Sequence, residues 1–578
     1  MTNGFRFGRF ELDPRARELR KDGIRLRLQD QPFEVLLTML QQPGEVLTRD
    51  ELRSRLWPDG TFVDFEHGLN AAVKRLRTAL GDQADRPRFV ETLHRRGYRF
   101  IGTVERVEAD ESQKEGKRRL AVVPFKSLGE ANDHEYFTEG LTEEMITKLG
   151  RLCSDRLGVV ARTSSMLARR NGQTARQIGQ MLHVDYLVEG SVRREADRVR
   201  ITVQLVETRG EMQLWAESYE RHLADCFLVQ SQVATEIAHA LAMELLPDSR
   251  AKGSAGTRHV GAHQAYLKGR YHWNKAADEG LLEAIAFYEQ ALALDPAFAA
   301  AYASLGRAHV AMADYYLQEP RVALEAGRVA ATRALELDPS ESDAHLTLAE
   351  VRKIADRDWD AAEAEYRFSL AINPSSEAAY RLYGMFLAGR GRSLEAASAL
   401  DRACDLDPLC LVVNTSAAWV RYLARDYDEA IDRCRHTLDM DPQFGPARRV
   451  LAGALVQAGR LGEALSELER ATASRPDKVT LAWLAHAAAI RGDTERAIGV
   501  LAALERAGQE GYVSGYHRAL AHTALGNIGE ACGLLEASAE ARDPAIINLA
   551  VEPRFEPLRA DPRYCELIKQ LELQNGQH

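Results

Sequence analysis

The sequence predicts a multidomain protein built from a small α+β domain, a small α/β domain and an all-α superhelix of repeats. Three observations support this fold class. The chain has 578 residues, more than one hydrophobic core usually accommodates. Short extended runs alternate with helical runs in the first part of the chain, whereas the second part is helical throughout. Prolines in the helical part recur about every 34 residues, which is the period of a helical repeat.

Charge is distributed unevenly along the chain. The net charge is −10, yet residues 1–106 contain twenty Lys and Arg against sixteen Asp and Glu. Their surplus of four positive charges leaves a net charge of −14 on the remaining residues. Because an acidic surface repels nucleic acid, we expect any nucleic-acid contact in the N-terminal part alone.

Cysteine usage and hydropathy indicate the compartment. The seven cysteines are scattered and odd in number, with no CxxC pair, which indicates reduced thiols and no metal site. The first twenty residues contain five arginines and no apolar core of a signal peptide. No run approaches the roughly 20 apolar residues that a membrane helix needs. We therefore expect a soluble, cytoplasmic protein without a membrane anchor.

Residues 1–106 are expected to form one domain, in which an antiparallel sheet precedes three helices and a β-hairpin. Alternating runs in residues 5–29 are separated by Asp-Pro and Asp-Gly turns, a pattern typical of short strands. Residues 31–42 have helical periodicity, and Thr48 with Glu51 forms a capping box that starts a second helix. This order of elements predicts a winged helix, in which a recognition helix enters the major groove of DNA.

The third helix and the hairpin, within Asn70–Gly102, are both basic. Between Asn70 and Arg99 there are eight Lys or Arg and three acidic residues. Lys74 lies opposite an apolar stripe at helical spacing, formed by Leu69, Val73, Leu76 and Leu80. Such a helix suits the major groove, and a basic hairpin suits the adjacent phosphates. The alternative is a solvated charged helix beside an ordinary hairpin.

Residues 4–104 contain, in this order, the segments FGRFELD, QPFEVLLTML, LTRDELRSRLWP and GLNAAVKRLR. The last of them runs into the motif VKRLRTALGD, and the motif ETLHRRGYRFIG follows. The chain here closely resembles the OmpR/PhoB-type DNA-binding domain, and especially its ToxR/CadC-like branch. In that branch a membrane helix typically follows, and in other members a receiver domain precedes; the sequence predicts neither. The resemblance implies that double-stranded DNA is the partner, and it suggests a homodimer.

The resemblance also implies roles for individual residues. The helix at 65–81 would be the recognition helix, and the wing would meet the minor groove or its phosphates. Tyr98 and Phe100 would pack beneath the wing, and the loop Pro58–Asp64 can touch RNA polymerase in the family. Ala71 stands where a base-reading side chain could be, which leaves the sequence preference open. The implied DNA-binding residues are Asn70, Lys74, Arg75, Arg77, His94, Arg95 and Arg96.

After a charged linker at 107–119, residues 120–250 alternate strands and helices and predict a small α/β domain. Its motifs, including LAVVPF and DYLVEGSVRREADRVRITVQLVET, resemble a TolB-N-like domain that has no agreed chemistry. Arg162–Ser165 and Glu189–Ser191 are polar groups expected at strand ends, where ligands can bind, although turn and cap chemistry is the alternative. The sequence contains no P-loop, Ser-His-Asp or HExxH pattern, so we expect no catalytic residues and no cofactor.

Residues 260–544 predict about eight TPR repeats, followed by a C-terminal capping segment at 545–578. Six prolines lie 43, 35, 34, 34 and 34 residues apart, and a small residue precedes each of them by twelve positions. The nine extra residues of the second repeat are expected to lengthen its loop near Asp314–Pro320. By position in the TPR consensus, a groove for a peptide or protein ligand would be lined by Arg381, Met385, Thr415, Trp419, Tyr422, Arg449 and Val456. The alternative for Trp419 and Tyr422 is burial between repeats.

Together these features predict a soluble one-component transcriptional regulator that is not an enzyme. Its winged helix would bind DNA, while the α/β and TPR domains sense a ligand or protein partner. One alternative is a TPR scaffold whose winged helix docks protein rather than DNA. Another is a small-molecule activity in the α/β domain, for which the sequence offers no motif.

Overall fold

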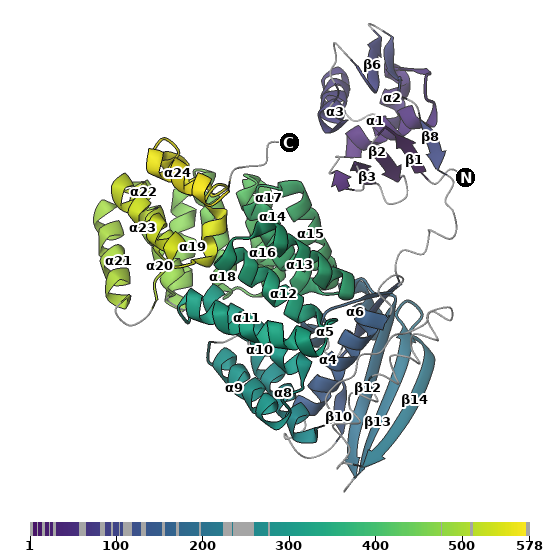
Figure 1. Cartoon of the computed structure of the whole chain (residues 1–578). Helices are drawn as coiled ribbons and strands as arrows, with labels where there is room; N and C mark the ends of the chain where they lie inside the picture. Colours follow the sequence, from purple (N-terminus) through teal and green to yellow (C-terminus); the bar gives the residue numbers. More distant parts are fainter. Residues whose placement is uncertain are drawn as a thin grey trace. The chain divides into compact units, whose positions relative to one another are not determined.

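A computed structural model of the chain describes residues 4–573, apart from residues 9, 14–17, 22–23, 27–29, 57–64, 81, 83–86, 94–95, 103, 108–117, 129–134, 153–156, 169–172, 196–197, 223–233, 235–258, 275–277, 475–476 and 509–511. The chain forms two compact units, Met1–Gly116 and Lys117–His578 (Figure 1). Each unit is described by itself. The multidomain fold class expected from the sequence is confirmed.

The first unit opens with an antiparallel sheet in the order β4-β3-β2-β1-β8. Four of its strands come from the predicted alternating runs, and β8 returns from beyond the hairpin to pair with β1. The short strands bury alternate apolar residues, among them Phe5, Phe7 and Leu12. Their bounds are β1 Gly4–Phe7, β2 Phe10–Asp13, β3 Glu18–Lys21, β4 Ile24–Leu26 and β8 Glu105–Val107.

Three helices and a small second sheet complete this unit as a winged helix. The predicted capping box is confirmed, because Glu51 N–H donates to Thr48 Oγ1 over 3.2 Å and Thr48 N–H donates to Glu51 Oε2 over 2.8 Å. The wing hairpin β6–β7 is extended by β5, which pairs with β7. The bounds are α1 Asp30–Gln41, β5 Val46–Thr48, α2 Arg49–Leu56, α3 Phe65–Leu80, β6 Val90–Leu93 and β7 Gly97–Phe100.

The second unit begins with an α/β domain whose sheet has the order β11-β9-β12-β13-β14, with β10 pairing β12. Strands β11, β9 and β12 are parallel, and β12, β13 and β14 form an antiparallel meander. The helix predicted over about 225–246 lies almost entirely outside the described residues. The bounds are β9 Arg118–Val122, β10 Lys126–Leu128, α4 Glu135–Leu152, β11 Leu157–Val159, α5 Arg162–Leu167, α6 Ala175–Leu182, β12 Tyr186–Glu195, β13 Arg198–Glu207 and β14 Met212–His222.

Among the described residues, eight helical pairs follow one another in the array. We number them as pairs 1 to 8. Small residues predicted to lie where two helices cross are buried, among them Ala284, Ala362 and Ala396 at 0% exposure. The bounds are α8 Val260–Trp273, α9 Asp278–Leu294, α10 Ala299–Asp314, α11 Pro320–Leu337, α12 Ser342–Val351 with η3 Arg352–Asp356, α13 Trp359–Ile372, α14 Glu377–Gly389, α15 Ser393–Leu406, α16 Leu411–Leu423, α17 Tyr427–Met440, α18 Gly445–Gln457, α19 Leu461–Ser474, α20 Lys478–Arg491, α21 Thr494–Ala507, α22 Gly515–Ala524 and α23 Ile528–Glu540.

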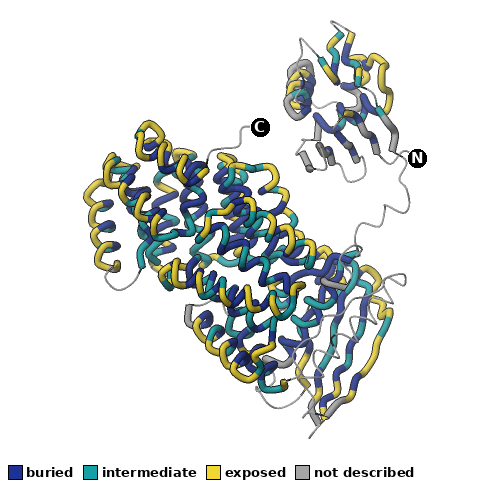
Figure 2. The backbone as a smooth tube through the Cα atoms, viewed as in Figure 1, coloured by how far each residue is buried: buried dark blue, intermediate teal, exposed yellow. Residues whose placement is uncertain are grey.

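The C-terminal segment consists of η4 Pro544–Asn548, η5 Pro553–Leu558 and α24 Pro562–Gln570. The sequence predicts a capping segment here. Its apolar residues join the main core of pairs 3 to 8, and Leu549, Phe555 and Leu558 have 0% exposure. Figure 2 shows buried residues throughout the interior of the array and exposed residues along its outer surface.

Candidate nucleic-acid interface

Helix α3 has the two faces predicted from its sequence. The apolar stripe packs into the core of the first unit, with Leu69, Val73, Leu76 and Leu80 at most 3% exposed. Lys74 and Arg75 are exposed on the other side. The apolar face therefore fixes the helix to the domain, and the two cations face solvent, where a DNA groove can reach them.

Two of the four predicted contact residues of α3, Asn70 and Arg77, form hydrogen bonds with the wing. The Tyr98 hydroxyl donates to Asn70 Oδ1 over 2.8 Å. The guanidinium of Arg77 donates through Nη2 to the Val90 carbonyl over 2.7 Å and to Thr92 Oγ1 over 2.8 Å. Asn70 and Arg77 thus set the angle between helix and wing. These partners are 13 to 28 residues away in the chain, a separation that helical periodicity does not reveal.

Asp82, one of the three acidic residues between Asn70 and Arg99, has a structural role. Its carboxylate is buried at 8% exposure and accepts from the backbone N–H groups of Arg88, Phe89 and Val90 over 2.6 to 3.1 Å. It thereby anchors the first wing strand to the end of α3. A buried carboxylate that accepts several backbone hydrogen bonds is held rigidly in place.

Cross-strand contacts shape the wing as well. Glu91 faces Arg99 in the register of β6 and β7 and binds its guanidinium over 2.6 Å. Arg96 is exposed at the turn between these strands. Tyr98 and Phe100 are buried beneath the wing at 3% and 1% exposure, as expected. His94, Arg95 and the loop Pro58–Asp64 lie outside the described residues.

The expected partner-binding residues of the array differ in how far they are buried and in whether they bond other residues of the chain. Arg381, Met385 and Trp419 are half-buried on the first helices of pairs 4 and 5. Tyr422 has 0% exposure, and its hydroxyl donates to Glu552 Oε1 over 2.6 Å. Arg449 donates to Asp477 Oδ2 over 2.8 Å and to Thr480 Oγ1 over 3.0 Å. Thr415 is buried at 8% exposure, and Val456 is half-buried.

The polar groups expected as a ligand site in the α/β domain have other roles. Ser164 donates from its backbone N–H to Asp407 Oδ1 over 2.8 Å and accepts from Leu409 N–H over 2.8 Å. It therefore joins the α/β domain to the loop between pairs 4 and 5. Gly190 lies inside β12 rather than at a strand end, and a Cβ there would collide with Phe125 and the Thr202 carbonyl.

In the part of the chain that the structure describes, no helix is both long and apolar enough to cross a bilayer. Within the same residues, no three His, Cys, Asp or Glu side chains gather as a metal site. A winged helix followed by an α/β domain and a helical-repeat array defines the class of the protein as a multidomain DNA-binding regulator.

Each of the three domains matches a known protein family over part of its length. Residues 23–100 match the family described as "Transcriptional regulatory protein, C terminal". Residues 116–238 match "HilA/YgeH-like transcriptional regulator, second domain", and residues 422–489 match "Tetratricopeptide repeat". The chain therefore contains an OmpR/PhoB-type DNA-binding domain, a HilA-like regulator domain and TPR repeats, which confirms the predicted resemblance.

Three similar proteins match different shares of the chain. "Transcriptional regulator HilA" of Salmonella typhimurium is 22% identical over 69% of this chain and 70% of its own length. "Putative adenylate cyclase 3" of Rhizobium meliloti is 33% identical over 40% of each chain, so the match spans less than half of that protein. "Cholera toxin homolog transcriptional activator" of Vibrio parahaemolyticus is 37% identical over 17% of this chain and 35% of its own.

Proposed function

We propose that the protein is a one-component transcriptional regulator, in which α3 and the wing bind double-stranded DNA. The observation that carries this proposal is the geometry of α3, which is buried on one face and presents Lys74 and Arg75 on the other. Together with Arg96, they form a surface for phosphates and base edges. We propose that His94 and Arg95, which precede Arg96 in the sequence, contact DNA as well. Asn70 and Arg77 support this surface by orienting the wing.

The second unit would supply the regulatory input without catalysing a reaction. TPR arrays bind proteins, and the α/β domain matches a regulator family, so we propose a protein partner for this unit. Binding would change how two winged helices are presented to tandem half-sites, in a homodimer of the chain. The loop Pro58–Asp64 would contact RNA polymerase.

The test is DNA binding by the full-length protein across a salt series. Lys74→Ala with Arg75→Ala should weaken binding to any duplex, because both cations neutralise phosphates. Each lost phosphate contact should lower the slope of log K against log salt by about 0.9. Lys569→Ala, which removes an exposed cation from α24, serves as the control and should leave the slope unchanged. An unchanged slope in the double variant would contradict the proposed surface.

The alternative is that the winged helix docks protein. This alternative predicts that the protein binds no duplex at any salt concentration. It also predicts a partner protein that the wild type captures and the double variant Lys74→Ala with Arg75→Ala does not. Whether the wild-type protein binds a duplex in the salt series therefore distinguishes the two functions.

A further inference from the structure

The C-terminal segment, residues 544–573, lies against the first helices of pairs 4 to 8. We call the surface formed by these helices the inner face. Ile547 of η4 touches Gly389 at the end of α14, and the Glu572 carbonyl accepts from Arg390 Nη1 over 2.6 Å. Further along the array, η5 packs against α22. The segment therefore contacts repeats that are up to 182 residues away in the sequence.

Two charged residues anchor the segment in the interior. Glu552 and Arg554 have side chains at 0% and 1% exposure and bind each other, with Arg554 Nε donating to Glu552 Oε1 over 2.8 Å. Tyr422 of α16 donates to the same carboxylate. The Arg554 guanidinium lies 3.6 Å from the centre of the Trp483 ring, in a cation–π contact with α20.

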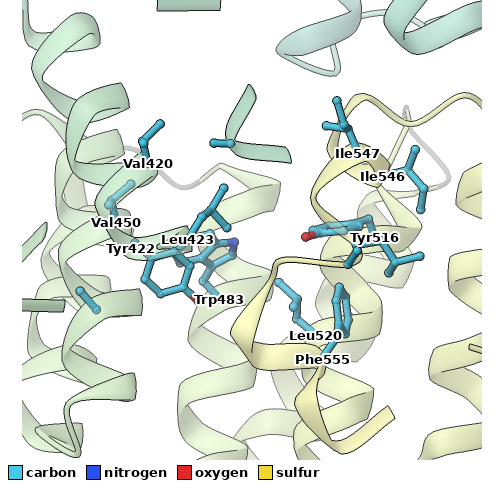
Figure 3. Packing of buried hydrophobic residues seen from close by; sticks show 14 of the residues in the cluster. Val420, Tyr422, Leu423, Val450, Trp483, Tyr516, Leu520, Ile546, Ile547 and Phe555 are labelled. Atoms are coloured by element: carbon cyan, nitrogen blue, oxygen red, sulfur yellow. The ribbon is translucent and has the colours of Figure 1, made fainter. Parts of the chain in front are cut away.

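Aromatic residues of the inner face lie near Phe555 of the segment (Figure 3). Phe555 follows Arg554 and packs edge-to-face on Tyr516 of α22, with ring centres 5.1 Å apart. Tyr422 of α16 and Trp483 of α20 both lie close to Gly453 of α18, where an added Cβ would be 3.6 Å and 2.8 Å from their rings. The segment thus contributes an acid, an arginine and an aromatic residue within four positions, and the inner face has a matched contact for each.

The long loop of pair 2 clasps the start of the segment. Tyr316, in this loop, donates from its hydroxyl to Asp543 Oδ1 over 3.0 Å, and Ser514 donates to the other oxygen over 2.6 Å. Arg321 donates to the Glu540 carbonyl over 3.0 Å. Tyr316 adopts φ +56°, a conformation that costs a non-glycine residue about 1 kcal/mol, so its side-chain contacts stabilise an unfavourable turn. The insertion noted in the sequence therefore connects the second pair to the eighth.

We propose that residues 544–573 are a built-in occupant of the inner face, and that a protein partner binds there by displacing them. The partner would present an acidic residue, an arginine two positions later and an aromatic residue directly after it. This deepens the proposed function, since it rests on the array binding a protein, and it names the surface and the partner's chemistry.

The inner face itself selects this chemistry. Without a carboxylate, the buried Tyr422 hydroxyl would lose its acceptor, which disfavours binding. Without a guanidinium, the face of Trp483 would lose its cation. An apolar peptide therefore binds less well than one with the Glu-X-Arg-aromatic pattern. Because the internal segment competes with the partner, only molecules that have released the segment can bind. The partner's apparent affinity is therefore lower the smaller the fraction of such molecules is.

The experiment uses a fluorescent peptide of residues 543–573 and the full-length protein. Fluorescence anisotropy should detect little binding to the wild type. Two variants should bind the peptide at least about ten-fold more tightly, because each weakens the internal segment by about 1.4 kcal/mol or more. One opens the clasp by Tyr316→Phe with Arg321→Ala, and the other replaces the anchors by Glu552→Gln with Arg554→Met.

Controls separate this proposal from DNA binding. A peptide with Arg554→Ala should not bind either variant, and far-ultraviolet circular dichroism should show both variants folded. Since the clasp variant leaves the segment itself intact, it provides the test if the anchor variant fails to fold. Equal peptide binding by wild type and clasp variant, or none by the folded clasp variant, would overturn the proposal. Binding to a duplex with a single half-site, measured on the same samples, would stay unchanged in either case, so the proposed function is judged separately.

Discussion

At the scale of single residues, cations that look equivalent in the sequence have different roles. Lys74 and Arg75 are exposed, whereas Arg77 is half-buried and holds the backbone of the wing. A basic helix therefore divides its charges between DNA and its own domain. The distinction is measurable, because loss of Arg77 disturbs the domain even without DNA.

We expect Arg77→Ala to loosen the wing. Loss of two hydrogen bonds from a half-buried guanidinium costs about 1–3 kcal/mol, so amides of β6 and β7 should exchange hydrogen about ten-fold faster or more. Lys74→Ala is the matched control and should leave exchange unchanged while weakening DNA binding. Equal exchange rates in the two variants would show that Arg77 does not support the wing.

Glu377, at the start of α14, predicts a pH dependence of stability. Burial, reinforced by the carboxylates of Asp407 and Asp343 and opposed by Arg381, raises the pKa of Glu377 to about 7. Since the folded state holds this proton more tightly than the unfolded state, the contribution of Glu377 to stability falls as pH rises from about 4.5 to about 7.

Glu377→Gln should therefore stabilise the protein at pH 8, by about 2 kcal/mol, and have a smaller effect at pH 5. Thermal unfolding of wild type and variant at both pH values measures this difference. Glu495→Gln, at an exposed position on α21, is the control. Parallel pH curves for Glu377→Gln and wild type would contradict the raised pKa.

At the scale of elements, Gly97 determines how closely the wing approaches β5. Its φ of +149° is unfavourable for other residues, and an added Cβ would collide with the Leu47 carbonyl. Gly44 also has a positive φ, of +82°, but an added Cβ there meets nothing within 4 Å. Substituting Gly44 therefore introduces backbone strain alone, whereas substituting Gly97 introduces both strain and a steric collision.

Gly97→Ala should destabilise the first unit by about 3 kcal/mol or more, since strain and collision add. Gly44→Ala should cost about 1 kcal/mol from strain alone. Denaturant unfolding of the full chain, followed by hydrogen exchange in β5 and β7, distinguishes them. Similar losses for both variants would indicate that the strands can separate to accommodate a methyl group.

Elements with local signals were predictable from the sequence, and those that depend on distant partners were not. The stripe of α3 and the Thr48 capping box follow from periodicity and spacing within a few residues. The 34-residue spacing likewise predicted the helical pairs, because each pair packs on its neighbours. Strand β8 and the Asp82 anchor depend on contacts that no local pattern encodes.

At the scale of the whole molecule, the α/β domain and the array are joined through specific contacts. Asp407 accepts from Ser164, and Ala161 N–H donates to the Leu406 carbonyl over 2.8 Å. Arg270 of α8 also binds Glu143 of α4. The sequence predicts Ser164 as part of a possible ligand site, because polar residues at strand ends can bind a ligand. Polar residues there can equally form contacts between domains, as Ser164 does. The array is therefore in direct contact with the α/β domain at both of these places.

The central claim, that the chain regulates transcription through α3 and the wing, is tested most directly by genome-wide footprinting of the full-length protein in cells. Wild type should protect discrete sites near promoters, and Lys74→Ala with Arg75→Ala should lose them while the protein remains at the same level. Footprints that persist in the double variant, or their absence in the wild type, would contradict the account.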